Sequence, residues 1–247
     1  MDPTARTPHD DRPWLVVGDD RTESSTFVWG WVAAQPWDGW RVTAVTARPP
    51  EVGVVPPDRS APHAWQPAPL RVLPGRDGGV EHLLAEADPR AVLDSFGAAD
   101  LLVVGHRGPG LLKRLHLGST AEWLVSAHRP LGPVAVVRST RPVREVLVCS
   151  DGSPSVLGAV DALAALPLVR GARVTVLGVD TLHADAQDGV RTVAARLEAV
   201  GAADVQTLLV GSVPMSAAFD VRPTILGTID RLEPDLVVVG TRGLGGL

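Results

Sequence analysis

The chain has 247 residues, a length that suits two domains of roughly 100–150 residues each better than a single one. Apolar residues make up 45% of the chain and charged residues 21%, which is typical of a folded globular protein and unlike a disordered one. The net charge is −5 and the Lys and Arg residues are scattered, so we expect neither nucleic-acid nor membrane binding.

The first domain is predicted over residues 13–140, after a polar tail over residues 1–12 that we expect to be disordered. It opens with a short valine-rich run, Trp14–Val17, that leads into Asp20, the pattern of a parallel strand buried on both faces. A helix is expected over about Thr120–His128. Similar apolar runs predict four further strands over Val42–Ala47, Val80–Leu84, Leu101–Gly105 and Val134–Arg138.

The second domain, predicted over residues 141–247, repeats the first. The segment Asp100–Gly110 reappears as Asp235–Gly245, and two shorter pairs of similar segments keep the same order along the chain. The repeated runs predict strands that start at Val146 and that cover Val174–Val179, Val205–Val210 and Leu236–Gly240. Strands that alternate with helices imply a parallel sheet with right-handed crossovers in each domain.

Helix signals are clearest in the second domain. Ser153 is a suitable N-cap with Pro154 at the first helical position, and apolar residues then recur at helical spacing to about Leu166. A second helix is predicted around Val190–Val200. The corresponding stretch of the first domain, Arg48–Arg76, holds many prolines and no helical period, so a long loop is expected to replace that helix.

A glycine-rich loop follows the fourth strand of the first domain. Gly105 and Gly108 allow a close approach of the backbone to a ligand, and Gly118, Ser119 and Thr120 open a helix whose N-terminal amides attract phosphate. Positive charge nearby is expected from Arg107, Lys113 and Arg114. Since ligands of open parallel sheets bind beyond the carboxyl ends of the strands, Asp20 is well placed to accept hydrogen bonds from a ribose hydroxyl or an adenine amine.

At these residues the sequence resembles the universal stress protein family, whose nucleotide-binding members carry Gly, two residues, Gly, nine residues, Gly, and then Ser or Thr. Gly105, Gly108, Gly118 and Ser119 match every spacing of that motif. The strand-end aspartate and the Asp-Leu-x-Val-Val-Gly strand of the family occur in both halves. The resemblance therefore spans roughly residues 14–138 and 146–247.

The resemblance implies two Rossmann-like, flavodoxin-like α/β domains with parallel five-strand sheets of order 3-2-1-4-5, the second without strand 5 in this sequence. It implies binding of ATP without catalytic turnover, and a regulatory role in the response to stress. It also implies a homodimer that pairs through strand 5 of the first domain. No catalytic or metal-binding residue is implied. The implied nucleotide-binding residues are Asp20, Ala47, Gly105, Arg107, Gly108, Gly118, Ser119 and Thr120.

The two halves depart from the family pattern in opposite ways. In the first, Arg21 stands where the family usually has Gly, and Ala47 where it usually has a Val against the adenine, while the phosphate end is intact. In the second, Asp151-Gly152-Ser153 and Val179 match, but the sequence stops four residues after Gly243, within the glycine loop. We therefore expect the second domain to be incomplete at its C-terminus, and at most one ATP, bound in the first domain.

Simpler interpretations exist for several of these residues. Ser119 and Glu122 have the spacing of a capping box, and Asp20 and Asp151 could be ordinary turn residues. The tryptophans in and after the first helix are better explained by core packing than by a ligand cage; they are Trp29, Trp31, Trp37 and Trp40. The histidines His106, His116 and His128 never reach the spacing of a metal site.

Cys149 is the only cysteine, which excludes an intramolecular disulfide and fits a cytoplasmic protein; we expect its thiol to be buried and inert. Two other functions stay open. An enzyme acting at the α-phosphate of ATP would carry a His-x-x-His or Ser-Gly-Gly-x-Asp-Ser signature, and Ser150–Ser155 has only one glycine. A nucleotide-free protein that uses the fold as a dimerisation scaffold is the other alternative.

Overall fold

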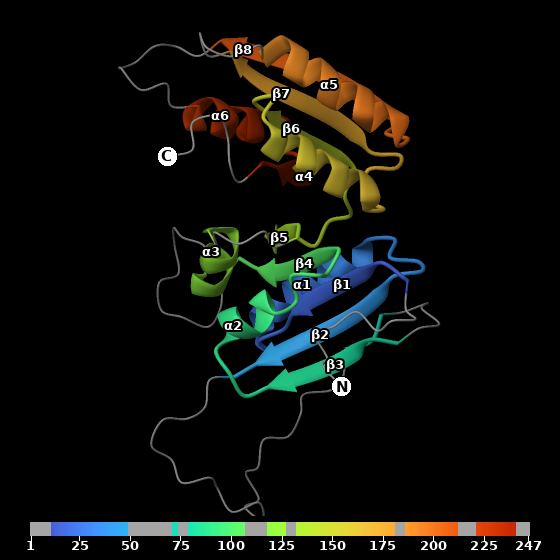
Figure 1. The fold of residues 1–247 in the computed structure, drawn as a ribbon, viewed down its shortest axis with the longest axis vertical. Helices are drawn as coiled ribbons and strands as arrows, with labels where there is room; N and C mark the ends of the chain where they lie inside the picture. The colour runs from blue at the N-terminus through green and yellow to red at the C-terminus, as the bar shows by residue number, and fades with distance from the viewer. Residues whose placement is uncertain are drawn as a thin grey trace, which may run out of the picture. The chain divides into compact units, whose positions relative to one another are not determined.

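The computed structural model describes residues 11–48, 71–73, 79–106, 118–126, 132–180, 186–211 and 221–240. The chain divides into two compact units, Met1–Thr140 and Arg141–Leu247. Each unit is built on one parallel β-sheet with helices packed against it (Figure 1). Most of the expected tail over residues 1–12, and nearly all of the expected long loop Arg48–Arg76, lie outside the described residues.

The first sheet has five parallel strands in the order β3-β2-β1-β4-β5, which agrees with the order that the resemblance implies. The strands lie within one or two residues of their predicted bounds. They are β1 (Trp14–Gly18), β2 (Arg41–Ala47), β3 (Glu81–Ala85), β4 (Leu101–Gly105) and β5 (Val134–Val137).

Three helices accompany this sheet: α1 (Glu23–Ala34), α2 (Pro89–Asp94) and α3 (Ser119–Ser126). Asp88 caps α2 by accepting a hydrogen bond from the backbone N–H of Arg90, and Pro89 occupies a first-turn position where a missing N–H costs nothing. Trp14 and Val16 of β1 pack with side chains of α2 and α3. Because side chains alternate along a strand, the residues between and after them face α1 instead.

The second sheet has four described strands in the order β8-β7-β6-β9, the order 3-2-1-4 that was predicted for this half. No fifth strand occurs among the described residues of this unit. The strands are β6 (Glu145–Ser150), β7 (Arg173–Asp180), β8 (Asp204–Gly211) and β9 (Leu236–Val238). The helices are α4 (Pro154–Ala165), α5 (Ala186–Ala199) and α6 (Arg222–Leu232).

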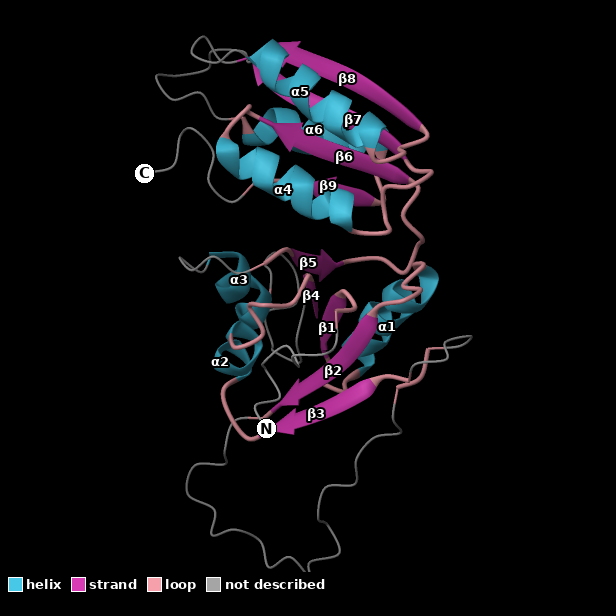
Figure 2. Ribbon diagram, turned by 45° about the vertical axis from the view of Figure 1, so that its right-hand side comes forward, coloured by secondary structure: helices cyan, strands magenta, loops and turns pink. Residues whose placement is uncertain are grey.

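Helices α4 and α5 contact each other and cover the same face of the second sheet (Figure 2). As predicted, Ser153 caps α4: its hydroxyl oxygen accepts a hydrogen bond from the backbone N–H of Val156, and Pro154 follows it. The buried residues of α4, Val156, Val160 and Leu163, recur at helical spacing.

The pairing register shows that the sequence repeat is a structural repeat. Leu15 of β1 is paired with Val42 and with Leu101, and Val146 of β6 is paired with Val174 and with Leu236. It follows that Asp20 and Asp151 are equivalent positions, and so are the residues that come next, Arg21 and Gly152.

The aspartate that opens the repeated Asp-Leu-x-Val-Val-Gly segment has a structural role in both units. Asp100 accepts a hydrogen bond of 2.7 Å from the backbone N–H of Trp14, at the start of β1. Asp235 accepts one of 3.1 Å from the backbone N–H of Glu145, at the start of β6. Each aspartate thereby ties the start of one central strand to the start of its neighbour, away from the carboxyl ends where the candidate site lies.

Candidate functional site

Three of the predicted site residues lie on adjacent strands at the carboxyl edge of the first sheet. Gly105 ends β4 and Ala47 ends β2, with β1 between them. The backbone N–H of Asp19 donates to the carbonyl of Val45 at 2.9 Å, so the β1–β2 ladder continues past the end of β1. Asp20 is then level with Ala47, because Gly18 is paired with Val45. The edge therefore brings Asp20, Ala47 and Gly105 together.

The residues on either side of the glycine loop, His106 and Gly118, lie next to each other at the end of β4. The backbone N–H of Gly118 donates to the carbonyl of His106 at 2.7 Å. His106 is itself tied to β5, with its N–H donating to the carbonyl of Val137 at 3.2 Å. The N-terminus of α3 is consequently held beside the end of β4. The loop residues Arg107, Gly108, Lys113 and Arg114 lie outside the described residues.

The start of α3 differs from the capping-box interpretation. The helix begins at Ser119, and the backbone N–H of Glu122 donates to the carbonyl of Gly118 at 2.9 Å. Gly118 therefore occupies the N-cap position, and Ser119 is the first residue of the helix rather than its cap. Gly118 and Thr120 are half-buried and Ser119 is exposed.

Asp20 lies in a tight turn between β1 and α1. Its Oδ1 accepts hydrogen bonds from the backbone N–H of Thr22 at 3.0 Å and from the Thr22 hydroxyl at 2.7 Å. Arg21, between them, has a φ of 59°, in the left-handed region that favours glycine. The exposed carboxylate of Asp20 is thus fixed to the turn that carries it.

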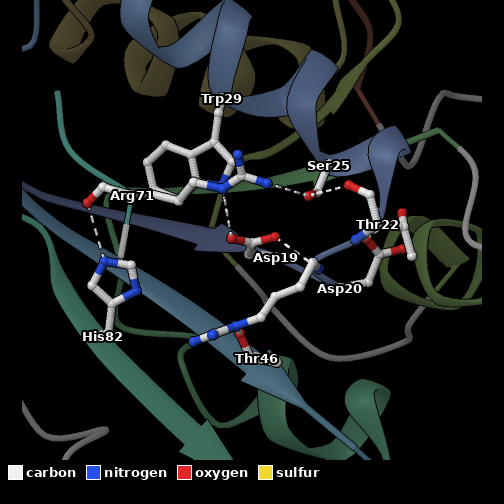
Figure 3. A network of polar contacts seen from close by, with 9 residues as sticks. Asp19, Asp20, Thr22, Ser25, Trp29, Thr46, Arg71 and His82 are labelled. Carbon is white, nitrogen blue, oxygen red and sulfur yellow. Dashed lines mark hydrogen bonds and ion pairs between the residues drawn. The ribbon is translucent and has the colours of Figure 1, made fainter. Parts of the chain in front are cut away.

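A second aspartate, which the sequence analysis missed, forms the centre of a buried network beside this turn (Figure 3). Asp19 is only 3% exposed. Its Oδ1 accepts from the backbone N–H of Arg21 at 2.8 Å, and its Oδ2 accepts from the Trp29 indole N–H at 2.9 Å. Arg71 donates from Nε to the same Oδ2 at 3.4 Å and from a terminal nitrogen to the Ser25 hydroxyl at 3.0 Å. The pair of consecutive aspartates in Gly18–Asp20 was the one available signal.

Opposing effects act on the pKa of the Asp19 carboxyl. Burial by itself raises it. Hydrogen bonds from the Ser25 hydroxyl, the Arg21 backbone and the Trp29 indole lower it, as does the charge of Arg71. The balance leaves the pKa below its ordinary value of 3.8, so Asp19 is a buried carboxylate near neutral pH.

The two aspartates lie on opposite faces of the sheet. Asp19 contacts Trp29 of α1, whereas alternation along β1 places Asp20 on the face of Val16, which packs against α2 and α3. Arg21 directs its Nε to the Thr46 hydroxyl at 3.1 Å. Since Val45 packs on the α2 and α3 face, Thr46 points to the α1 face, and the side chain of Arg21 lies there too. Arg21 thus departs from the family residue without covering the face that carries Asp20.

The corresponding turn of the second unit keeps the backbone hydrogen bond to its aspartate. The backbone N–H of Ser153 donates to Asp151 Oδ1 at 2.9 Å, and Gly152 has a φ of 72°. The backbone of Gly152 approaches α5 closely, because a Cβ placed on Gly189 would lie 2.6 Å from the Cα of Gly152. The remainder of the second glycine loop, from residue 241 on and including Gly243, lies outside the described residues.

Other candidate groups add no site in the part of the chain that the structure describes. Cys149 is half-buried rather than fully buried, and burial raises the pKa of its thiol to about 11. Within the described residues, no group of three or more His, Cys, Asp or Glu residues could hold a metal ion. No helix in those same ranges is both long and apolar enough to cross a membrane. His116 and His128 lie outside them.

Comparison with known proteins gives one curated relative and several structural neighbours, and no family model matches. A universal stress protein of Mycolicibacterium smegmatis is 39% identical over 75 residues, a match that spans 28% of this chain and 25% of that protein. A universal stress protein structure from Archaeoglobus fulgidus aligns over 91% of this chain and 85% of its own, with a TM-score of 0.62 and 15% identity. A Pseudomonas aeruginosa structure assigned to the same family aligns over 95% and 85%, with a TM-score of 0.51 and 16% identity.

The fold defines the class of protein. It is an α/β protein with two parallel, Rossmann-like sheets whose strands pair in matching register. The resemblance recognised in the sequence motifs is confirmed, because the curated relative and both structural neighbours are universal stress proteins by name. At 15% and 16% identity the structural neighbours support the fold alone. The curated relative is matched over about a quarter of its length, so its activity and partners are not carried over.

Proposed function

We propose that the first unit binds ATP at the carboxyl edge of its sheet. Asp20 would hold the ribose or the base, next to Ala47, and the phosphates would lie on the glycine loop and on the first turn of α3. The phosphate-binding residues of this proposal are Gly105, Arg107, Gly108, Gly118, Ser119 and Thr120.

The observation that carries the proposal is the hydrogen bond from Gly118 to the carbonyl of His106. It holds the first turn of α3 at the end of β4, one strand away from β1 and Asp20. The N–H groups of a first helical turn have no partner within the helix and carry a partial positive charge, which favours a phosphate group. A carboxylate on the next strand supplies the acceptor that a ribose or an adenine amine needs.

The proposal includes binding without turnover. A bound ATP would act as a signal in a regulatory protein of the stress response, and the cytoplasmic location predicted from the sequence belongs to the same proposal. No catalytic group is assigned. Incubation with ATP and analysis of the products should therefore show no ADP or AMP above the buffer control, and protein-dependent hydrolysis would contradict this part.

Calorimetry on the full chain tests the site. We expect a stoichiometry of at most one ATP per chain. Ser119→Ala should weaken binding about tenfold or more, because a hydrogen bond to a charged phosphate contributes about 1.5–3 kcal/mol. Asp20→Ala should weaken binding as well, and the matched change in the second unit, Asp151→Ala, should leave it unchanged.

Three results would overturn the assignment. A stoichiometry near two would mean that the second unit also binds. Loss of binding in Asp151→Ala but not in Asp20→Ala would place the site in the second unit. No binding at millimolar ATP would leave the nucleotide-free scaffold as the better function.

We also propose that two copies of the chain pair through β5. This strand forms one edge of the first sheet, and an edge strand of valines offers unpaired backbone groups to a second copy. Light scattering should then give the mass of a dimer, and a charged substitution on β5 away from the core cluster that Val134 and Val136 contact, Ala135→Lys, should give that of a monomer. A monomer at high micromolar concentration of the unaltered chain would rule the pairing out.

A further inference from the structure

The turn after the first strand has the same left-handed backbone in both units but is made from different residues. Gly152 has a φ of 72° in the second unit, and Arg21 has a φ of 59° in the first. Glycine adopts this conformation freely, whereas a side chain brings its Cβ close to the backbone and makes it unfavourable. The first unit therefore keeps a glycine conformation with an arginine, and something else must stabilise it.

The two units also differ in the side chain, two residues earlier, that accepts a hydrogen bond from the N–H of this turn residue. In the second unit the N–H of Gly152 donates to the Ser150 hydroxyl at 3.3 Å. In the first, the N–H of Arg21 donates to the Asp19 carboxylate at 2.8 Å. A hydrogen bond to an ionised acceptor is shorter and about twice as strong as one to a neutral acceptor. The stronger acceptor, the Asp19 carboxylate, thus occurs in the unit where the left-handed residue is an arginine and its conformation needs stabilising.

The Asp19 carboxylate is also held in place from its other oxygen. Oδ2 accepts from the Trp29 indole N–H and is paired with Arg71, so the carboxylate cannot rotate away from the turn without losing both. Figure 3 shows Asp19 between Trp29 above and the turn at its side. The result is a rigid acceptor, fixed to α1 and to the chain before β3, that faces the N–H of Arg21.

The orientation of Asp20 depends on this turn. Asp20 stands between Asp19 and Arg21, and its own carboxylate is held by the N–H and hydroxyl of Thr22. If Arg21 left the left-handed region, the N–H of Thr22 would move and Asp20 would lose that support. The side chain that fixes Arg21 therefore fixes the direction of Asp20 as well.

We infer that Asp19 is a positioning residue of the nucleotide site: it holds the left-handed turn at Arg21 and thereby orients Asp20 toward the ligand from the opposite face of the sheet. This inference rests on the proposed binding of ATP for its effect on the ligand. The stabilisation of the turn does not depend on it.

A double-mutant cycle on the full chain tests the inference, with ATP affinity measured by calorimetry. Asp19→Ser should weaken ATP about tenfold in the presence of Arg21, because a weaker acceptor no longer holds the strained turn. Combined with Arg21→Gly, the same change should weaken ATP by less than about twofold relative to Arg21→Gly alone. The doubly substituted chain has the same pair of residues as the second unit, Ser150 and Gly152, where the turn forms with a hydroxyl acceptor.

Two control variants separate positioning from packing. Trp29→Phe and Arg71→Gln each remove a partner of Asp19 Oδ2 and leave the bond to Arg21 in place. Both should lower the midpoint of urea unfolding and change the ATP affinity by less than about twofold. Two results would show that Asp19 only stabilises the packing of the core, and either would overturn the inference. One is an equal loss of ATP affinity for Asp19→Ser with Arg21 and with Arg21→Gly. The other is a loss for Trp29→Phe as large as that for Asp19→Ser.

Hydrogen exchange of the Arg21 amide, measured without nucleotide, keeps this test apart from that of the proposed function. Asp19→Ser should speed exchange of this amide about tenfold, while Trp29→Phe should not. If the unaltered chain fails to bind ATP but shows this pattern of exchange, the nucleotide proposal and the effect of Asp19 on the ligand are overturned. The role of Asp19 in the turn is then still supported. Binding of ATP with unchanged exchange in Asp19→Ser would overturn the role of Asp19 alone.

Discussion

The two units cover equivalent faces of their sheets in different ways. In the second, α5 packs against β7 and β8 beside α4. In the described part of the first, no helix takes that place, and α1 carries large buried side chains instead. Trp29 and Trp31 of α1 stand where α4 has Val160 and Ala162, and Trp31, Trp37 and Trp40 form an aromatic cluster with ring centroids 5.9 and 5.2 Å apart. The first unit thus buries larger side chains on and after α1 than the second unit buries on α4.

The turn at the candidate site lies beside this difference in packing. Where α5 approaches the turn, glycine is required on the helix, because a Cβ on Gly189 would lie 2.6 Å from the Cα of Gly152. Where no described helix approaches, the side chain of Arg21 extends over the same face to Thr46, at the position of Gly178 in the second unit. The two turns therefore differ in what lies against them on this face of the sheet: helix α5 in the second unit and the side chain of Arg21 in the first.

Burial of the fourth strand shows the same dependence on neighbours. Leu101–Val104 of β4 are at most 4% exposed, since β5 pairs with their outer edge. Leu236–Val238 of β9, with nearly the same sequence, are all partly exposed, and Val239 is 55% exposed. The sequence of a strand determines that it can be buried, and its neighbours determine whether it is.

The largest difference in free energy of unfolding is expected between substitutions at the first residues of the two central strands, β1 and β6. Trp14 is fully buried, donates its indole N–H to the Thr43 hydroxyl at 2.9 Å and lies 4.6 Å from the Arg41 guanidinium. Trp14→Ala should lower the free energy of unfolding of the first unit by about 3–5 kcal/mol. The equivalent residue, Glu145, forms an ion pair with Arg173 near the surface, and Glu145→Ala should cost about 1 kcal/mol or less.

Chemical denaturation followed by tryptophan fluorescence measures Trp14→Ala, because all seven tryptophans lie in the first unit, whereas Glu145 lies in the second. The second unit can be followed in parallel by hydrogen exchange. Similar losses of unfolding free energy for Trp14→Ala and Glu145→Ala would mean that these two residues contribute more equally to stability than their burial indicates.

An intermediate effect is expected where α5 meets the turn. Gly189→Ala would place a Cβ 2.6 Å from the Cα of Gly152, so the helix or the turn must move, at a cost of about 1–3 kcal/mol. Gly158→Ala in α4 is the matched control, because nothing lies within 4 Å of the added Cβ. This control should stabilise the second unit by about 0.5–1 kcal/mol through helix propensity. Hydrogen exchange of the β6 and β7 amides measures both, and stabilisation by both would show that the close contact is not tight.

The smallest effect is expected from the charge of Asp19, and it should depend on pH. The pKa of the folded state lies below the ordinary value of 3.8, so the carboxylate stabilises the fold above that pH and ceases to do so as the pH falls through the folded pKa. Asp19→Asn keeps an acceptor oxygen and should cost about 1 kcal/mol near neutral pH. The difference from the unaltered chain should shrink as the pH falls below 3.8 and through the folded-state pKa.

Urea unfolding of the two proteins across this pH range measures the effect. The position equivalent to Asp19 is Ser150, which does not titrate in this range, so Ser150→Ala should show no such pH dependence. A difference between Asp19→Asn and the unaltered chain that stays constant down to acidic pH would mean that Asp19 carries no charge in the fold.

Local patterns and the internal repeat determine most of the architecture. Valine-rich runs locate the strands, Ser153 and Pro154 locate the start of α4, and the repeat indicates two units, because each of these signals lies within a few neighbouring residues. The strand-end position of Asp20 and Gly105 follows from the same runs. For the same reason, Asp19 is indistinguishable in the sequence from any polar residue after a strand.

Contacts between distant residues decide the rest. The partners of Asp19 include Trp29 and Arg71, ten and 52 residues further along the chain, and the glycine at position 189 of α5 is required by the backbone of Gly152. The face to which Arg21 points depends on Thr46 of the neighbouring strand. Such pairings carry no signal in the spacing of a single sequence, since they arise only when the crossover connections bring the strands and helices together at one edge of the sheet.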